Sequence, residues 1–341
     1  MTHRFPIKEI ARHAGIGTAT VDRVINGRAH VSPQTKLRVA RAIADMERQE
    51  GQIATQGRQM FFDFVIEAPK RFSREVKAAA ENVMREIGTA ACRSRFTLQE
   101  IMSTDEVVQI LNRITKRGSQ GVCIKVRDVS EIRTAVDRVV AAGIPVVTLV
   151  TDVQGTHRTS YVGLDNTGAG RTAAYLVGQI VGDMPGCVLA TRSNARFLGE
   201  EERASAFSDA LMQTCPHLRI VTANAGGGVH FETTKDLEGV IGWLDDLVAV
   251  YSMGGGNQTI LNVLETHRLK PKVYVAHDLD RDNRALIETG QINFILHHDL
   301  RKDLRGVFAA FFRHQDMRIE VEEPRVSSVM VITPENIPVT S

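Results

Sequence analysis

The sequence of 341 residues lacks the features that would assign it to several protein classes. It has no run of about 18 apolar residues, so we do not expect a membrane span. The four cysteines form no CxxC pair and are expected to be reduced apolar residues rather than a disulfide framework. Aromatic residues make up only 5% of the chain, and no apolar signal region follows Met1. These absences predict a cytoplasmic location.

The remaining composition is that of a globular protein. The apolar fraction is 43% and the charged fraction 24%, which excludes collagen and wholesale disorder. The length predicts two or three domains. Charge is uneven: residues 1–58 hold ten Lys and Arg against five Asp and Glu, whereas residues 59–341 hold 32 against 35. The basic end predicts a module that binds a polyanion, although a merely solvated basic end is the alternative.

The basic end contains the pattern of a helix-turn-helix. Ile7, Ile10, Ala11 and Ala14 follow helical spacing, and Gly15 ends that segment. A second helix is predicted from Thr18 to Asn26. A third begins at Ser32-Pro33, with its apolar stripe formed by Leu37, Ala40, Ile43, Ala44 and Met46.

The second of these helices presents its polar side chains outward. Thr18 and Thr20 can hydrogen-bond bases or phosphates, Ala19 can contact a thymine methyl group, and Arg23 can bind guanine or phosphate. Its N-terminal residues would enter the DNA major groove. The alternative is a three-helix cap with a solvated polar face.

The segment IKEIARHAGIGTATVDRVIN, residues 7–26, with GRAHVSPQT after it, resembles the headpiece of the lactose-repressor (LacI/GalR) family. The match continues to about Met46. It implies a homodimeric repressor that binds a near-palindromic double-stranded operator. The resemblance implies base reading by Thr18 and Ala19, and DNA contact or headpiece orientation by Thr20, Arg23, Asn26 and His30.

Two features depart from that family. Asp22 replaces the usual Ser or Ala, and its carboxylate either pairs with Arg23 or Arg28 or accepts from a cytosine amino group. After the third helix the family has a hinge helix with an intercalating Leu, but here Gly51 and Gly57 disfavour a helix. Ile53 is the only candidate wedge. A flexible linker therefore competes with a hinge helix.

Residues 59–341 alternate between strand and helix patterns. This alternation predicts an α/β fold with parallel sheets, and its length predicts two lobes. We therefore expect a headpiece and hinge at 1–58 and a ligand-binding and dimerisation core at 59–341. The predicted strands are Phe61–Ile66, Gly121–Ile124, Pro145–Val150, Tyr161–Gly163, Cys187–Ala190, Arg219–Ala223, Leu247–Tyr251, Val273–Ala276 and Ile292–Leu296.

Polar residues follow these strands where parallel sheets bind ligands. Each could equally be a helix cap or a solvated loop residue, but together they predict a pocket. The core also resembles the family's sugar-binding domain, which is similar to periplasmic sugar-binding proteins, with VGLDNTGAGRTAAYL, residues 162–176, as its best match. The predicted ligand-binding residues are Phe72, Lys125, Asp152, Asp165, Arg203, Asn257, Asp278 and His298.

These residue types suit a polyhydroxylated ligand, because carboxylates and amides bond adjacent hydroxyl groups and Arg donates in a fixed fork. The three basic members also suit a sugar acid or a phosphate. The prediction is a ligand-controlled regulator without enzymatic activity, cofactor or metal, its ligand a small sugar, polyol or sugar acid. Trp243 is predicted to be core packing.

An NAD(P)-binding enzyme with a fused headpiece is the main alternative. Gly168-Ala-Gly-Arg-Thr-Ala173 fits GxGxxA, but no acid follows the next strand. Its glycines more simply allow close helix–strand packing. His297-His298-Asp299 has no third metal ligand nearby, and the acids of Asp278–Asp282 are better explained by a helix N-terminus than by calcium.

Overall fold

A computed structural model describes residues 5–28, 31–54, 59–87, 92–193, 197–224, 230–317 and 326–338. His30 lies outside these ranges. Ile53 lies inside a helix, but only its backbone is described. Within the described residues, no helix combines the length and apolar character needed to cross a membrane.

Three helices form the headpiece: α1 (Ile7–Ala14), α2 (Thr18–Ile25) and α3 (Pro33–Ala54). The turn after α1 depends on Gly15, whose φ of 62° lies in the left-handed region. Ile10, Ala11, Val21 and Val39 form the buried centre of this unit. The predictions for Leu37 and Ala40 are wrong, because both are exposed, Leu37 to 53%, and Val39 and Ala42 are buried instead.

The hinge region does not begin as a separate helix. Helix α3 continues from Pro33 through Gly51 to Ala54 without interruption. Gly51 therefore does not end the helix, although a glycine inside a helix costs about 1 kcal/mol relative to alanine. Gly57 lies outside the described residues, so the competition between a hinge helix and a linker at 55–58 stays a prediction.

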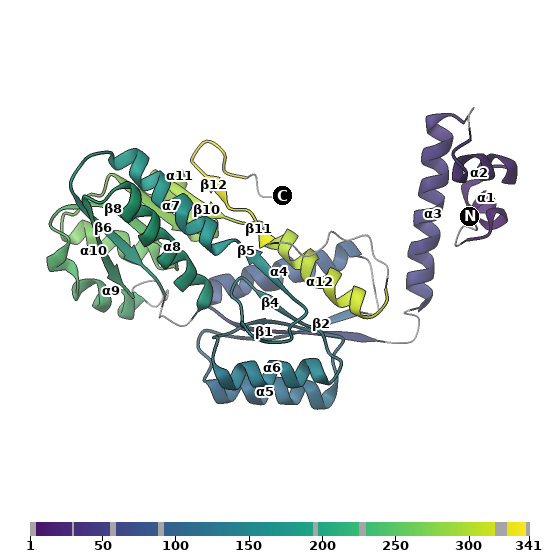
Figure 1. Cartoon of the computed structure of the whole chain (residues 1–341), viewed down its shortest axis with the longest axis horizontal. Coiled ribbons are helices and arrows are strands. Elements are labelled where there is room, and N and C mark those ends of the chain that lie inside the picture. Colours follow the sequence, from purple (N-terminus) through teal and green to yellow (C-terminus); the bar gives the residue numbers. More distant parts are fainter. Residues whose placement is uncertain are drawn as a thin grey trace.

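The core has two lobes, each built on a six-stranded sheet (Figure 1). The first, here the N-lobe, has the strand order β11-β5-β4-β3-β1-β2, with all pairs parallel. Helices α5 and α6 cover one face of the sheet, and α4 and α12 cover the other. Its elements are β1 (Met60–Glu67), α4 (Lys70–Ile87), β2 (Cys92–Gln99), α5 (Thr104–Arg117), β3 (Gly121–Lys125), α6 (Ser130–Ala141), β4 (Val146–Leu149), β5 (Ser160–Leu164), α12 (Leu300–His314) and β11 (Val326–Ser327).

The second lobe, here the C-lobe, has the strand order β12-β10-β9-β8-β6-β7, and only the edge strand β12 is antiparallel. Helices α7 and α8 pack on one face, and α9, α10 and α11 on the other. Its elements are α7 (Asn166–Val181), β6 (Gly186–Thr191), α8 (Leu198–Thr214), β7 (Leu218–Ala223), α9 (His230–Glu238), the 3-10 helix Ile241–Trp243, β8 (Leu247–Ser252), α10 (Asn257–Thr266), β9 (Val273–His277), α11 (Arg281–Glu288), β10 (Phe294–His297) and β12 (Met330–Ile332).

The chain crosses between the lobes three times. It passes from β5 to α7, from β10 back to α12, and from β11 to β12. The predicted two-lobed α/β core with parallel sheets and a helical headpiece is therefore confirmed. Each lobe directs the carboxyl ends of its parallel strands toward these crossings, which is where such folds bind ligands.

Helices α7 and α8 approach each other closely at Gly170. A Cβ atom at this position would lie 2.4 Å from the carbonyl oxygen of Arg203. The glycine thus permits helix–helix packing, whereas the sequence interpretation was helix–strand packing. The contact also fixes the start of α8, which carries Arg203 into the region between the lobes.

Trp243 does not belong to the core. It lies in the short 3-10 helix and is 67% exposed, while the next residue, Leu244, is fully buried. The prediction of core packing for Trp243 is therefore wrong.

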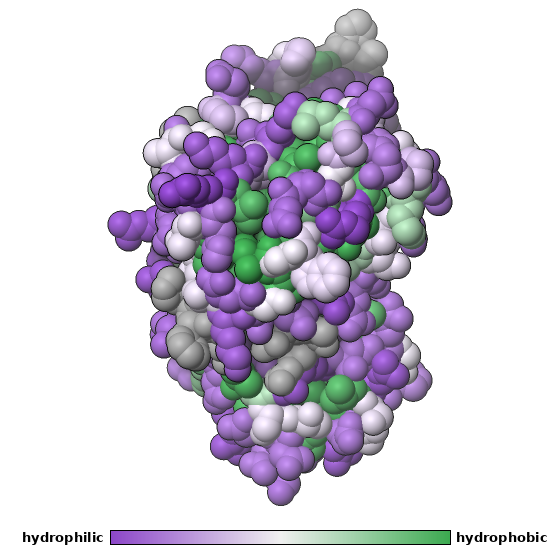
Figure 2. All heavy atoms as spheres, turned by 90° about the vertical axis from the view of Figure 1, so that its left-hand side faces the viewer, coloured by the Kyte–Doolittle hydropathy of each residue, from purple (hydrophilic) through white to green (hydrophobic). Residues whose placement is uncertain are grey.

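In the view onto the C-lobe end, apolar side chains form patches separated by hydrophilic ones (Figure 2).

Candidate functional site

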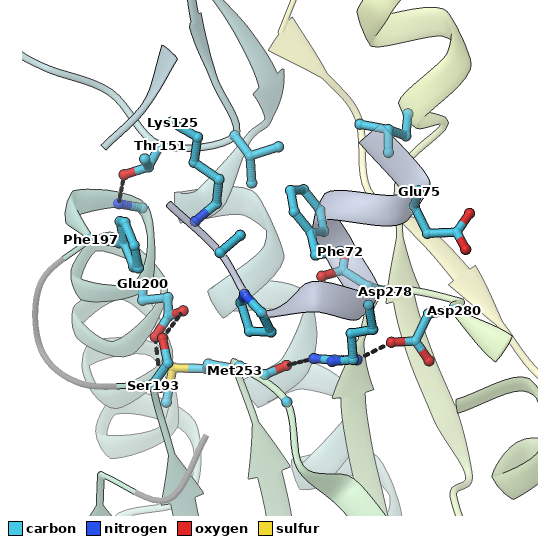
Figure 3. A pocket seen from close by; sticks show the side chains of 18 of the residues that line it. Phe72, Glu75, Lys125, Thr151, Ser193, Phe197, Glu200, Met253, Asp278 and Asp280 are labelled. Carbon is cyan, nitrogen blue, oxygen red and sulfur yellow. Dashed lines mark hydrogen bonds and ion pairs between the residues drawn. The ribbon is translucent and has the colours of Figure 1, made fainter. Parts of the chain in front are cut away.

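A cavity of about 130 Å³ lies between the two lobes (Figure 3). Residues from the loops after β1, β4, β6, β8, β9 and β10 contribute to it, together with the starts of α4 and α8. Its lining residues are Ala68, Pro69, Arg71, Phe72, Glu75, Lys125, Val150, Thr151, Ser193, Phe197, Gly199, Glu200, Arg203, Met253, Gly254, Gly255, Asp278, Leu279, Asp280, His297, His298 and Leu300.

Five of the eight residues predicted to bind ligand are brought together at this cavity. Phe72 and Lys125 come from the N-lobe, whereas Arg203 and Asp278 come from the C-lobe. His298 lies on the crossing between β10 and α12.

The other three predicted residues do not line the cavity, because each has a local structural partner. Asp152 accepts hydrogen bonds from Thr148 and the Val153 backbone and pairs with Arg158. Asp165 caps helix α7 by accepting from the Gly168 N–H at 2.8 Å. Asn257 is buried at the start of α10 among hydrogen bonds to Asn283 and Tyr274.

Lys125 is a buried cation between two aromatic rings. Its Nζ lies 3.6 Å from the centre of the Phe197 ring and 5.8 Å from that of Phe72, and it donates to the Glu67 carbonyl at 3.2 Å. Burial lowers the pKa of Lys125 to about 8, although Glu200 and Glu67 oppose the shift. The ammonium group and the rings together offer a charged donor beside apolar faces.

Arg203 and Glu200 lie one helical turn apart on α8 and carry opposite charges. The Arg203 guanidinium donates to Asn166 at 2.7 Å and to the Met253 carbonyl at 3.0 Å, and the residue is 4% exposed. Glu200 accepts from the backbone and hydroxyl of Ser193. Burial raises the pKa of Glu200 despite those hydrogen bonds and the neighbouring cations.

Asp278 and His298 face each other across 3.7 Å between Oδ1 and Nε2. Asp278 has a φ of 65°, an uncommon conformation outside glycine that Asp tolerates better than most residues. Burial alone would raise the pKa of Asp278, but His298 and Arg203 outweigh it and the pKa is lowered. The carboxylate is therefore charged and can accept hydroxyl hydrogen bonds.

Arg71 is a cavity residue that the sequence interpretation missed. It is the second residue of α4, and its guanidinium forms an ion pair with Asp280 of the opposite lobe. A basic residue beside Phe72 gave no sign of this role, because reaching Asp280 depends on the closeness of two lobes. Glu200 and Ser193 were also missed, because their hydrogen bonds form between the end of β6 and the start of α8 and no apolar periodicity marks them.

The headpiece carries the second candidate site on the outer face of α2. Thr18, Ala19, Arg23 and Asn26 are exposed there, and Thr20 is half-buried. The N-cap residue is Gly17, which has no side chain to accept from the first N–H groups of α2. Such a helix end suits a phosphate.

Asp22 pairs within the headpiece. Its carboxylate lies 3.3 Å from Nη1 of Arg28 and accepts from the Asn26 amide at 2.8 Å. Of the alternatives left by the sequence, the Arg28 pair is the one formed in the structure. The pairing neutralises a charge that would otherwise repel DNA phosphates.

Two family models match the chain. Residues 6–47 match the bacterial regulatory proteins of the lacI family, and residues 65–302 match the periplasmic binding protein domain. The chain belongs to the lacI family of regulators. Its core is a periplasmic-binding-protein domain, which covers well over half of the sequence. No curated protein gives a significant sequence match.

Solved structures share the fold of this lacI-family core at low sequence identity. A glucose-galactose binding protein from Geobacillus stearothermophilus is 19% identical, with a TM-score of 0.71 over 82% of this chain and 99% of that one. A putative LacI transcriptional regulator from Bacteroides fragilis is 14% identical, with a TM-score of 0.72 over 82% and 98%. A Burkholderia graminis solute-binding protein solved with D-arabinose is 19% identical, with a TM-score of 0.69 over 82% and 96%.

The features that suggested an enzyme or a metal have structural roles in this lacI-family chain. Gly168 donates its N–H to the cap residue Asp165, and Gly170 makes room for α8. Asp280 accepts from the Asn283 N–H and caps α11, as expected for acids at a helix N-terminus. Within the described ranges, no three His, Cys, Asp or Glu residues are placed to hold a metal ion.

Proposed function

We propose that this chain is a transcriptional repressor whose affinity for double-stranded operator DNA is controlled by a small polyhydroxylated ligand bound between the lobes. The ligand is a sugar, polyol or sugar acid. The chain works as a homodimer in the cytoplasm and needs no cofactor. Its headpiece and hinge span residues 1–58, and its core spans residues 59–341. It catalyses no reaction.

The cavity between the lobes is the observation that carries this proposal. It gathers Asp278 and Glu200 as acceptors, Lys125 and Arg203 as donors, and the Phe72 ring as an apolar face. A ligand with several adjacent hydroxyl groups uses both kinds of polar group and the ring. Because the lining comes from both lobes, a ligand there changes how they sit together.

Two solved structures with this fold give independent support, since one is a glucose-galactose binding protein and the other is a solute-binding protein solved with D-arabinose. Regulation then follows from linkage: a ligand that binds one lobe arrangement better shifts the population toward it, and DNA affinity changes by the same coupling free energy, typically about 1–3 kcal/mol.

Ligand binding is tested by thermal shift of the full chain with a panel of sugars, polyols and sugar acids. A ligand present at 100 times its Kd stabilises the folded core by about 2.7 kcal/mol. We expect Asp278→Asn to abolish the shift. Asp165→Asn is the matched control, because Asn also caps a helix and position 165 is outside the cavity. Absence of any shift at millimolar concentrations contradicts the sensor role.

DNA control is tested by gel shift with duplexes from the regions flanking the chain's own gene, with and without each stabilising compound. We expect a change in apparent affinity with ligand for the wild type and none for Asp278→Asn. Fluorescence titration with NAD and NADP tests the enzyme alternative, and saturable binding of either nucleotide supports that alternative instead.

A further inference from the structure

One arginine of the N-lobe forms an ion pair with the C-lobe across the cavity. Arg71 lies near the start of α4 in the N-lobe, and its guanidinium pairs with Asp280 at the start of α11 in the C-lobe. Nη2 also approaches the Gly254 carbonyl at 3.5 Å. The Arg71 side chain is 21% exposed and the Asp280 side chain 8%, so the pair is largely removed from water. Figure 3 shows the dashed contact that ends on Asp280.

The chain provides room for this arginine at Gly255. A Cβ atom there would lie 1.8 Å from Nη2 and 2.7 Å from Cζ of Arg71. The backbone of Gly255 is not in the left-handed region, so another residue would be conformationally acceptable. A side chain at position 255 would therefore displace the guanidinium end of Arg71 from its present place.

The electrostatic surroundings of Arg71 come from the opposite lobe. Besides Asp280, the carboxylates of Asp278, Asp282 and Glu200 act on its charge, and all belong to the C-lobe. They oppose the burial that lowers the pKa of Arg71. One N-lobe cation thus faces several C-lobe acids, an arrangement that favours approach of the lobes.

The hydrogen bonding of Arg71 is incomplete in this arrangement. Its Nε–H is buried and has no hydrogen-bond partner among the residues that the structure describes. An unsatisfied buried donor is unfavourable, and an acceptor that reaches it recovers that free energy. A ligand oxygen at the Arg71 side of the cavity would therefore stabilise the same lobe arrangement that the ion pair stabilises.

We propose that Arg71 is a specificity-determining residue. It holds the two lobes together through its ion pair with Asp280, in the space left by Gly255. Its Nε–H selects ligands that have an oxygen acceptor on that side of the cavity. The selection of ligand rests on the proposed function. The tie between the lobes does not.

The test measures the distance between the lobes in the full chain by pulsed electron spin resonance. Spin labels are placed at Lys116→Cys on α5 and Met212→Cys on α8, both exposed positions on opposite lobes. The four native cysteines are buried and react poorly with the label. Dilution with unlabelled chain isolates distances within one chain.

Without sugar, we expect Arg71→Met to lower the ratio of closed to open chains about tenfold, which corresponds to about 1.4 kcal/mol. Asp280→Asn should act in the same direction while keeping the α11 cap, and Gly255→Ala should also open the lobes. Gly242→Ala is the control, since a Cβ there meets nothing within 4 Å. The proposed connection between the lobes is refuted if Arg71→Met and Gly255→Ala both show the label-to-label distances of the wild type. It is also refuted if the wild type has no closed population.

A second arm adds D-galactose, D-arabinose and galactonate separately. Arg71→Lys keeps a charge for Asp280 but has no Nε–H of this geometry, so its closure by sugar should be weaker than that of the wild type. Equal responses overturn the selective role of Nε. If no compound moves the wild type, the proposed function fails for these sugars, and the comparison without sugar still decides the tie.

Discussion

His298 is hydrogen-bonded through Nδ1 to Asp303, five residues later on α12. Both side chains are almost fully buried. Asp303 also accepts from the Ser327 hydroxyl at 2.5 Å. His298 and Ser327 adjoin two different crossings between the lobes. This cluster therefore joins these two crossings to the wall of the cavity.

The first prediction concerns the pH dependence of this cluster. Burial lowers the pKa of His298, but the hydrogen bond and charge of Asp303 outweigh it, and the pKa is raised. The native chain therefore binds the proton more tightly than the unfolded chain. The resulting stability is fully present below about pH 6.5 and is lost as pH rises through the raised pKa.

Urea unfolding of the wild type and His298→Gln from pH 5.5 to 9 measures this effect. The free energy of unfolding of the wild type should exceed that of His298→Gln at low pH, and this difference should shrink as pH rises. Asp303→Asn should remove most of the change in the difference with pH. A wild-type advantage that does not change over this range contradicts the assignment.

The second prediction concerns Lys125, whose pKa of about 8 is lowered mainly by burial. An unfolded lysine titrates near pH 10.4, so between about pH 8 and 10.4 the unfolded chain holds more protons. Stability from this group therefore rises with pH in that window, by at most about 1.4 kcal/mol per pH unit. Chemical unfolding at pH 7, 8, 9 and 10 should show this rise in the wild type relative to Lys125→Met. Parallel curves would refute it.

The third prediction tests the contact between α7 and α8. Gly170→Val should reduce the free energy of unfolding by about 1–3 kcal/mol or more, because its side chain would overlap the backbone of α8. Gly239→Ala is the matched control, since its nearest neighbour would be an ordinary 3.5 Å away. Equal denaturation midpoints for Gly170→Val and the wild type would show that the helices separate without cost.

The fourth prediction concerns the headpiece. Arg23→Ala should weaken binding to duplex DNA and reduce the slope of log affinity against log salt by about 1, if Arg23 contacts a phosphate. Gel-shift titrations at several salt concentrations measure both quantities. Unchanged affinity and slope would remove Arg23 from the interface.

The fifth prediction concerns Asp22 and uses the same assay with a mixed-sequence 30-base-pair duplex. Asp22→Asn keeps a side-chain oxygen for the Asn26 amide but removes the charge that pairs with Arg28. Non-specific affinity should rise and its salt slope steepen, since Arg28 then has its full charge available to phosphates. Weaker binding with an unchanged slope would instead indicate that Asp22 itself accepts from a base.

The sequence was sufficient for the elements whose apolar residues are continuous. Strands such as Val273–His277 are buried on both faces, and a run of apolar residues reveals them. Strand β2, with the sequence CRSRFTLQ, was not predicted, because it is a mostly half-buried edge strand with few apolar residues. Helix α9 is short and mainly polar, so its sequence carries no clear apolar stripe.

The residues of the cavity were predicted only in part. A polar residue after a strand is as suitable for capping the next helix as for facing a ligand, and Asp165 and Asp278 show the two outcomes. The pair of Arg71 with Asp280 depends on how two lobes meet. No spacing along the chain encodes that distance.

Helix α12 completes the core of the N-lobe from the far end of the sequence. Its Phe308, Phe311 and Phe312 rings pack around Phe62 of β1, and Phe311 stacks on Phe62 with centroids 5.2 Å apart. The segment from α7 to β10 holds most of the C-lobe in one continuous stretch. During synthesis the C-lobe can therefore become compact first. The N-lobe strands, although made earlier, keep one apolar face of their sheet partly uncovered until α12 leaves the ribosome.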